Sequence, residues 1–326
     1  MSDPRYTADA VPGSRKRSRL WWLGPLASII IFVSSIVVLW LIVREIEPDD
    51  LRNAFSHTSR EQLLIAAGFA ALSYLLLSGY DALALKRLGL SIPFGTTALG
   101  SFSSYAVSFT LGFPLVTAGS VRYWVYSPRG VRTSEIASLT IIAGLTFWLG
   151  MGLVLGVALA YAAEPVAKLA RTTPFVMQMV GIGVFAVVAA YLFWVGTGDR
   201  SIKVKGWRLP LPGPGLTLAQ MTLGALELCS AATVLFVLLP GGHGITYEAF
   251  LAVYVFACLI SIASHAPGGL GVFEATMLIA LSQLPYQSII GALLLFRLFY
   301  YLIPFVLALA LLALYEIARR IRTRPL

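Results

Sequence analysis

The stretch Ser264-His265-Ala266-Pro267-Gly268-Gly269-Leu270-Gly271-Val272-Phe273-Glu274 interrupts a long apolar segment that covers residues 248–283. Lipid tails offer no hydrogen-bond partners, so a backbone break at membrane depth must be satisfied within the protein. The proline, the histidine, the carboxylate and the glycines of this stretch would be costly if they faced lipid. Such breaks occur where the backbone is buried in protein or lines a polar cavity, which is where a transported substrate binds. The stretch therefore predicts a broken membrane segment with a site at the break.

The composition is that of an integral membrane protein. The chain has 326 residues, of which 58% are hydrophobic and 12% are charged. Soluble globular domains carry about 25% charged residues, and several windows reach the roughly 18 apolar residues that a spanning helix needs. The net charge of +9 is concentrated in short segments beside the apolar runs. This pattern orients a protein in a membrane and does not indicate nucleic-acid binding.

The basic segments decide how the chain crosses the membrane. The apolar segments are 20–43, 63–85, 93–121, 136–162, 175–196, 216–239, 248–283 and 288–316. If all of them crossed, two strongly basic loops, 122–132 and 200–208, would lie on the side opposite the basic N-terminus, against the positive-inside rule. If 93–121 is instead a hairpin that enters from the cytoplasm, and 248–283 one that enters from outside, every strongly basic segment becomes cytoplasmic. A half-helix of about 13 residues reaches only about 20 Å, which is short of the hydrocarbon core.

These assignments predict an all-α polytopic membrane protein with six full transmembrane helices and two re-entrant helical hairpins. The second group of four segments enters the membrane in the opposite orientation to the first, which is the inverted 4+4 repeat typical of secondary transporters. The predicted organisation is a basic cytoplasmic tail (1–19), a single transmembrane domain (20–316) with repeats at about 20–162 and 175–316, and a basic cytoplasmic tail (317–326). Both termini are expected in the cytoplasm.

Few ionisable residues lie inside the apolar segments, and each is a candidate for function. They are Asp81, Glu227, His265, Glu274 and Arg297. Each costs roughly 2.5–3.5 kcal/mol at the bilayer centre on insertion scales, so each is expected to have a partner or a cavity. The acidic residues of the second and sixth segments occupy corresponding spans of the two repeats. Tyr300 and Tyr301 follow Arg297 by one helical turn.

The break itself has two interpretations. In the first, the backbone N–H groups of Gly268, Gly269 and Gly271 hold a phosphate at the positive end of the following half-helix. In the second, Pro267 and the glycines only turn the chain, and Glu274 balances the helix dipole or pairs with Arg297. We favour the first, because a plain turn would be less costly outside the membrane.

A second group of candidates follows the first hairpin. Arg122, Tyr123 and Tyr126 would either anchor the protein at the membrane interface or bind a lipid headgroup, because arginine offers a bidentate fork to phosphate. The histidines, cysteines and carboxylates show no metal-ligand spacing, and neither a Ser/His/Asp arrangement nor a phosphate-binding loop is visible. We therefore expect no metal, no cofactor and no ATP hydrolysis.

Four motifs in order resemble a known family. The first is the Tyr105–Gly119 stretch, whose end runs on as Ala118-Gly119-Ser120-Val121-Arg122-Tyr123. The others are Phe147-Trp148-Leu149-Gly150, Ser264–Glu274 and Leu295–Pro304. This pattern is similar to the membrane region of the bacterial lysylphosphatidylglycerol synthases (multiple-peptide-resistance factors, MprF) and, more broadly, to the YbhN-like membrane proteins that share it. The resemblance covers roughly residues 20–316. It implies a multi-pass protein of the bacterial inner membrane.

The resemblance also implies a function. In the full synthases this region is a flippase that moves aminoacylated phosphatidylglycerol to the outer leaflet and confers resistance to cationic antimicrobial peptides. The synthases carry a soluble transferase domain that is not seen here, so we expect an ATP-independent lipid flippase that is not an enzyme. The alternative is a lipid-binding membrane partner of a separate transferase or envelope-lipid enzyme, without transport. A membrane-embedded transferase is a weaker option, for which only His265 with Glu274 qualifies.

The expected partners are membrane lipids, either anionic or aminoacylated phospholipids, together with a second copy of the chain or a separate lipid-modifying enzyme. The expected substrate-binding residues share a place at one of the two hairpins or on the last span. They are Arg122, Tyr123, Tyr126, His265, Pro267, Gly268, Gly269, Gly271, Glu274, Arg297, Tyr300 and Tyr301, with Asp81 and Glu227 as intramembrane acidic groups.

Overall fold

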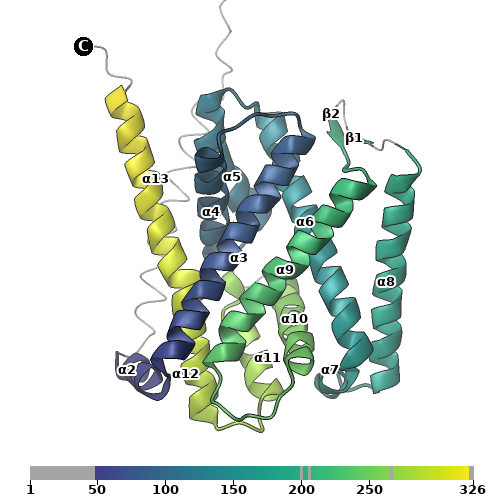
Figure 1. Cartoon of the computed structure of the whole chain (residues 1–326), viewed down its shortest axis with the longest axis vertical. Helices are drawn as coiled ribbons and strands as arrows, with labels where there is room; N and C mark the ends of the chain where they lie inside the picture. Colours follow the sequence, from purple (N-terminus) through teal and green to yellow (C-terminus); the bar gives the residue numbers. More distant parts are fainter. Residues whose placement is uncertain (1–47, 199–200, 205–206, 265–266, 323–326) are drawn as a thin grey trace, which may run out of the picture.

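The computed structural model describes residues 48–198, 201–204, 207–264 and 267–322, and these form a bundle of helices (Figure 1). The predicted tail 1–19, the predicted first span 20–43 and His265 lie outside the described residues. The helices are α2 (Pro48–His57), α3 (Arg60–Arg87), α4 (Phe94–Leu111), α5 (Pro114–Tyr126), η1 (Ser127–Arg129), α6 (Thr133–Tyr161), α7 (Ala163–Leu169), α8 (Pro174–Gly196), α9 (Pro214–Leu238), α10 (Tyr247–Ser264), η2 (Pro267–Gly269), α11 (Val272–Ala280), α12 (Tyr286–Arg297), η3 (Leu298–Leu302) and α13 (Ile303–Arg322).

The described helices confirm a polytopic membrane protein. Within the described residues, six helical segments are long and apolar enough to cross a membrane. Five of them, Arg60–Arg87, Thr133–Tyr161, Pro174–Gly196, Pro214–Leu238 and Tyr286–Ile321, coincide with predicted spans. The sixth, Tyr247–Ser264, is the first arm of the predicted outer hairpin, and its 18 residues measure about 27 Å, close to the thickness of the hydrocarbon core.

Capping residues fix the ends of the helices locally. Ser59 accepts a hydrogen bond from the Gln62 amide at 3.1 Å, and the Gln62 side chain accepts one from the Ser59 amide at 3.0 Å. This capping box begins α3. The side-chain Nε2 of Gln62 also donates to the carbonyls of Val237 and Leu239, at 2.8 and 3.0 Å. The same residue therefore ties the start of α3 to the end of α9.

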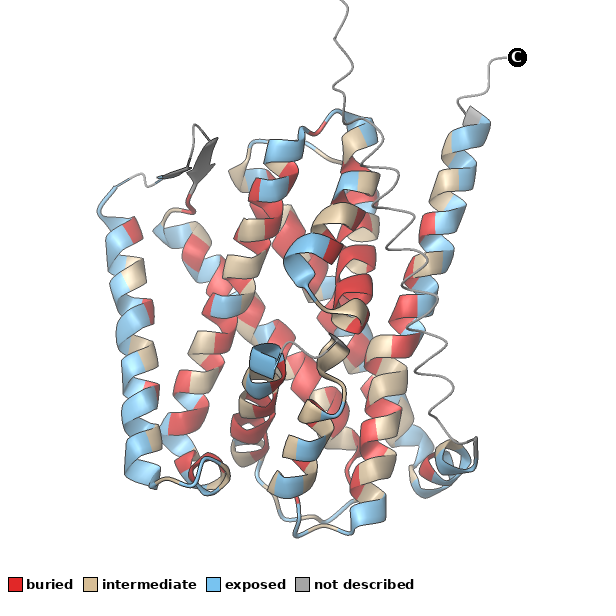
Figure 2. Cartoon of the chain, turned by 180° about the vertical axis from the view of Figure 1, so that it is seen from behind, coloured by how far each residue is buried: buried red, intermediate tan, exposed pale blue. Residues whose placement is uncertain are grey.

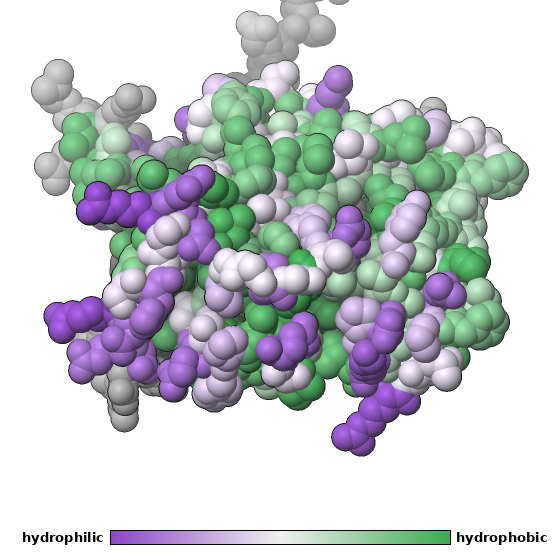
Figure 3. All heavy atoms as spheres, turned by 60° about the horizontal axis from the view of Figure 1, so that its bottom comes forward, coloured by the Kyte–Doolittle hydropathy of each residue, from purple (hydrophilic) through white to green (hydrophobic). Residues whose placement is uncertain are grey.

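The loops gather at two opposite ends of the bundle. In Figure 1 the α3–α4 connection, the strands after α8 and the end of α13 lie at the top, while α2, α7 and the α11–α12 connection lie at the bottom. The top group is the one predicted to be cytoplasmic. Figure 3 shows polar side chains gathered at the bottom end beside a largely apolar flank. The side of the membrane that each end faces stays a prediction.

Both predicted hairpin segments are interrupted. The first breaks between α4 and α5 at Gly112 and Phe113, which have φ of 77° and 51°, and the two arms pack against each other. The second breaks between α10 and α11, where Gly268, Gly269 and Gly271 all have positive φ, a region that glycine enters without steric cost. Figure 1 shows α4 and α5 at the upper end and α11 at the lower end. Their re-entrant nature in a bilayer, and the inverted repeat, stay predictions.

Two features depart from the predicted all-α arrangement of unbroken spans. Strands β1 (Ser201–Val204) and β2 (Trp207–Pro210) form an antiparallel pair with Ser201 opposite Pro210 in the connection between α8 and α9. The last span, predicted as one segment over 288–316, is divided by a π-helical turn at Leu298–Leu302. A single π turn inserts a residue into the α-helical ladder without a sequence signal as clear as that of proline.

The α6 and α9 backbones touch where the two helices cross. A Cβ on Gly150 would lie 2.4 Å from the carbonyl carbon of Gly224, so the two backbones are in contact. Figure 2 shows buried residues along the helices at the centre of the bundle, whereas α8, at the left of that view, is largely exposed. The exposed apolar surface of α8 is consistent with lipid contact.

We expect Gly150→Val to lower the free energy of unfolding by about 1–3 kcal/mol, because the added methyl groups must push the two backbones apart. Thermal unfolding of the purified protein in detergent, followed by tryptophan fluorescence, measures the change. Gly144→Val is the control in the same helix, because a Cβ at Gly144 meets no atom within 4 Å. Equal unfolding temperatures for the two variants would contradict the prediction.

Candidate functional site

The break in the second hairpin is held by an ion pair. The Arg297 guanidinium donates a short hydrogen bond from Nε to a Glu274 carboxylate oxygen, and its Nη1 donates to the carbonyl of Gly268 at 3.3 Å. The other Glu274 oxygen accepts from the Gly271 amide at 2.9 Å and so caps α11. The Arg297 and Glu274 side chains are 12% and 23% exposed. The pair therefore lies in the protein interior with part of its surface open.

The two breaks touch each other. A Cβ on Gly268 would lie 3.0 Å from the carbonyl oxygen of Thr110 and 3.2 Å from that of Phe109. These carbonyls belong to the last turn of α4, beside the first break. The close approach needs glycine at this position, both for space and for its φ of 59°. Segments more than 150 residues apart in the chain thus meet at their interruptions.

A second ion pair is fully buried between α3 and α5. Arg122 donates from Nε and Nη2 to the two carboxylate oxygens of Asp81, at 3.0 and 2.6 Å. Arg122 is 1% exposed and Asp81 is 0% exposed. The Tyr126 hydroxyl donates to the same carboxylate at 3.0 Å. The Arg122 fork is therefore occupied by Asp81, and the Tyr105 ring covers the guanidinium at 5.1 Å.

Gly100 makes this arrangement possible. A Cβ at Gly100 would lie 2.5 Å from the Tyr126 ring, so any larger residue would displace the tyrosine from Asp81. The Tyr126 hydroxyl also lies 3.1 Å from the Thr97 carbonyl in the same helix as Gly100. The α4 helix thus supplies both the space for the tyrosine and a second acceptor.

Glu227 occupies a third buried site that contains hydroxyl groups. Its carboxylate accepts hydrogen bonds from Ser73 at 2.9 Å, from Tyr300 at 3.0 Å and from Tyr80 at 3.2 Å. The side chains come from α3, α9 and the π turn, and Glu227 is 2% exposed. The Tyr74 hydroxyl donates to the Tyr300 carbonyl at 3.1 Å. The π turn is therefore tied to α3 through both its side chain and its backbone.

Aromatic rings connect the ion pair at the break with the Glu227 site. The Tyr301 ring lies 5.2 Å from the Arg297 guanidinium carbon. Phe109, at the end of α4, stacks on Tyr300 with centroids 6.0 Å apart, and Phe296 stacks on Tyr300 at 5.4 Å. Rings at these separations attract one another and fix the orientation of the groups that they carry.

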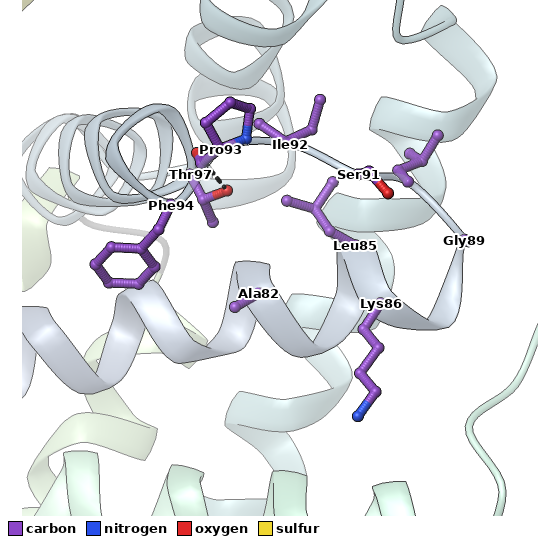
Figure 4. Close-up of a pocket in the computed structure, with 10 residues that line it drawn as sticks. Ala82, Leu85, Lys86, Gly89, Ser91, Ile92, Pro93, Phe94 and Thr97 are labelled. Carbon is purple, nitrogen blue, oxygen red and sulfur yellow. Dashed lines mark hydrogen bonds between the residues drawn. The ribbon is translucent and has the colours of Figure 1, made fainter.

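An open hollow of about 700 Å³ lies at the α3–α4 connection (Figure 4). It is bordered by Leu85, Lys86, Ser91, Pro93 and Thr97 among others. The Thr97 hydroxyl donates to the Pro93 carbonyl at 3.4 Å, as the dashed line in Figure 4 shows. Because the Thr97 carbonyl accepts from Tyr126, this hollow lies next to the buried Asp81 site.

The predicted site residues fall into two groups. Gly268, Gly271, Glu274, Arg297 and Tyr301 come together at the second break, and Arg122 with Tyr126 joins Asp81. Tyr300 belongs to the Glu227 site. Pro267 and Gly269 lie in the turn of the second break, whereas Tyr123 is exposed, on a different face of α5 from Arg122.

Sequence reasoning missed the groups that complete these sites. Ser73, Tyr80, Gly100 and Tyr105 were not predicted as site residues, because hydroxyls and glycines are common in apolar helices. The helical spacing of Ser73, Tyr80 and Asp81 along α3 could have indicated a polar face directed at the acidic residues.

Comparison with known proteins identifies the family. The model of the lysylphosphatidylglycerol synthase TM region matches residues 22–308. The chain is 33% identical to the uncharacterized protein slr0712 of Synechocystis sp. over 83% of this chain and 84% of that protein. It is 29% identical to the inner membrane protein YbhN of Escherichia coli over 90% and 92% of the two chains.

A third relative is much longer than the region it shares with this chain. The chain is 24% identical to a phosphatidylglycerol lysyltransferase of Staphylococcus haemolyticus over 86% of this chain and 33% of that protein. The matched part is the membrane region that gives the family its description. The chain belongs to the family of the lysylphosphatidylglycerol synthase TM region.

Proposed function

We propose that the protein is an ATP-independent flippase that moves a phospholipid between the leaflets of the inner membrane. The meeting of the two breaks at the Glu274–Arg297 pair is the observation that carries this proposal. A polar, partly open site between two broken segments offers a headgroup the contacts that lipid tails cannot supply. The acyl chains remain in the bilayer while the headgroup passes, so no ATP is needed for movement down a concentration gradient.

The ion pair matches a headgroup that carries both charges. Arg297 would exchange the Glu274 carboxylate for a lipid phosphate, which accepts the guanidinium fork in the same way. Glu274 would then accept an ammonium group. A phosphate and an amine in one headgroup occur in aminoacylated phosphatidylglycerol, which is our candidate substrate. The lysyltransferase relative, whose name refers to phosphatidylglycerol, supports this class of lipid.

A buried hydroxyl group at the break supports the same site. The Ser261 hydroxyl is buried and has no hydrogen-bond partner among the described residues. It lies 3.3 Å from the position that a Cβ on Gly269 would occupy. A buried hydroxyl without a partner costs free energy, and a headgroup oxygen near Gly269 would satisfy it.

Proteoliposomes that contain tail-labelled fluorescent phosphatidylglycerol test the proposal. A membrane-impermeant reductant bleaches the outer leaflet, and inner-leaflet label becomes accessible only if the protein moves it. We expect the wild type to expose the inner label and Arg297→Ala to do so at least about tenfold more slowly, because charge-assisted hydrogen bonds contribute about 1.5–3 kcal/mol.

Arg132→Ala is the matched control. This arginine pairs with Glu135 at 2.6 Å on the surface, with its side chain 78% exposed, and we expect its variant to move lipid as the wild type does. Intact transport by folded Arg297→Ala would overturn the site assignment. Intact transport of labelled aminoacylated phosphatidylglycerol by folded Glu274→Gln would overturn it as well. Lipid binding without leaflet exchange in the wild type would overturn the flippase proposal and favour a lipid-binding partner of a separate enzyme.

A further inference from the structure

Asp81, Glu227 and Glu274 are the acidic residues predicted to lie inside the membrane, and two of them have an arginine partner. Arg122 pairs with Asp81, and Arg297 pairs with Glu274. Glu227 forms none of the ion pairs that the described residues make, and its hydrogen-bond partners are the hydroxyls of Ser73, Tyr80 and Tyr300. Glu227 is therefore the acidic group whose negative charge the described part of the interior leaves uncompensated.

The titratable groups near Glu227 on the surrounding helices are phenols and thiols. They are Tyr74 and Tyr80 of α3, Tyr105 of α4, Cys229 of α9, Tyr254 and Cys258 of α10, and Tyr300 and Tyr301 of the π turn. None of these side chains carries a positive charge. Burying an ionised carboxylate without a cation is expensive in a medium of low dielectric constant. Binding of one proton removes that charge without any other change in composition.

The geometry at Glu227 fits a site for a proton. The hydroxyl oxygens lie 2.9–3.2 Å from the carboxylate oxygens, which is the range of hydrogen bonds. Hydroxyls can also reverse their role, since each donates to a carboxylate and can accept from a carboxylic acid.

The π turn connects Glu227 with the break. Tyr300 donates to Glu227, and the next residue, Tyr301, lies under the Arg297 guanidinium. A π turn is a weak point in a helix and is frequent at functional sites. A change of charge at Glu227 would alter the hydrogen bonds of Tyr300, which lies in the turn directly after Arg297.

We propose that Glu227 is an exchangeable proton site that couples proton movement to lipid movement. One proton binds to a Glu227 carboxylate oxygen on one side of the membrane and leaves on the other; no other bond forms or breaks. The proposal rests on the proposed flippase function. It assigns the coupling to Glu227, while Asp81 stays paired with Arg122 and Glu274 keeps its proposed role in headgroup binding.

Proteoliposomes with an imposed pH difference test the coupling. One pH unit stores about 1.4 kcal/mol per proton, which can sustain up to a tenfold asymmetry of labelled phosphatidylglycerol between the leaflets. We expect the wild type to develop this asymmetry and Glu227→Gln to leave the leaflets equal. Glu248→Gln, the same change at an exposed residue of α10, is expected to behave as the wild type.

Infrared spectroscopy of the detergent-solubilised protein provides a readout that does not depend on transport. As the pH falls, the wild type is expected to gain the carbonyl band of a protonated, buried carboxyl group, and Glu227→Gln is expected to lack it. Lipid exchange that ignores the pH difference, or responds to sodium instead, would overturn the proton coupling but not the flippase. A carbonyl band that titrates in a protein without lipid exchange would overturn both the flippase and the coupling. A band identical in the wild type and in Glu227→Gln would overturn the proton site itself.

Discussion

Arg122→Leu is expected to lower the free energy of unfolding by about 3–5 kcal/mol, the largest effect on stability that we predict. The substitution leaves Asp81, which is 0% exposed, as a buried carboxylate without a cation. Removal of one partner from a buried ion pair has a cost of this size because the remaining charge keeps its desolvation penalty. The Tyr126 hydroxyl alone cannot replace the two charge-assisted hydrogen bonds that Arg122 donates.

The double variant Asp81→Leu/Arg122→Leu separates the contribution of charge from that of packing. It removes both charges, and the Tyr126 hydroxyl keeps the Thr97 carbonyl as its acceptor. We expect it to be more stable than Arg122→Leu, since hydrophobic replacement of a whole buried pair is often neutral or stabilising. Denaturant or thermal unfolding in detergent measures all of the variants. A double variant less stable than Arg122→Leu would contradict this expectation. It would show that the Asp81–Arg122 ion pair itself stabilises the fold.

The sequence alone predicted the features that depend on the hydrophobic effect. The lengths of the apolar segments predicted the positions of α3, α6, α8 and α9, because a membrane-spanning helix needs about 20 apolar residues and proline or a capping group marks its start. The break at Gly268–Gly271 was predicted for a similar reason, because glycine and proline disrupt a helix wherever it lies.

The partners of the ionisable residues were harder to predict. The cost of an intramembrane charge predicted that Asp81 and Arg297 have partners, and the pairing of Arg297 with Glu274 was one of two interpretations considered. The pairing of Asp81 with Arg122 was not foreseen, because it joins α3 to α5 through a tertiary contact. The same holds for the π turn and for the hydroxyls around Glu227, since many weak preferences decide them together.

Gly268→Val is expected to slow lipid exchange at least about tenfold, the largest loss of function that we predict for a residue without a charged side chain. Its Cβ would lie 3.0 Å from the Thr110 carbonyl oxygen, and valine adds two methyl groups to that contact. The two breaks would have to move apart, and the Gly268 carbonyl would withdraw from Arg297. A tenfold slower rate corresponds to a rise of about 1.4 kcal/mol in the activation barrier. This is a modest share of the free energy of the contacts that the substitution disturbs.

Gly242→Val is the control that distinguishes the effect of pushing the two breaks apart from the effect of backbone strain. Gly242 has a φ of 73°, close to the 59° of Gly268, but a Cβ there meets no atom within 4 Å. Both variants have the cost of a left-handed residue, about 1–2 kcal/mol, and the contact with Thr110 adds a further loss of stability only in Gly268→Val. Only Gly268→Val should slow the appearance of inner-leaflet label in proteoliposomes. If both folded variants moved lipid at the wild-type rate, contact between the breaks would not be required for transport, and the headgroup path would have to lie elsewhere in the bundle.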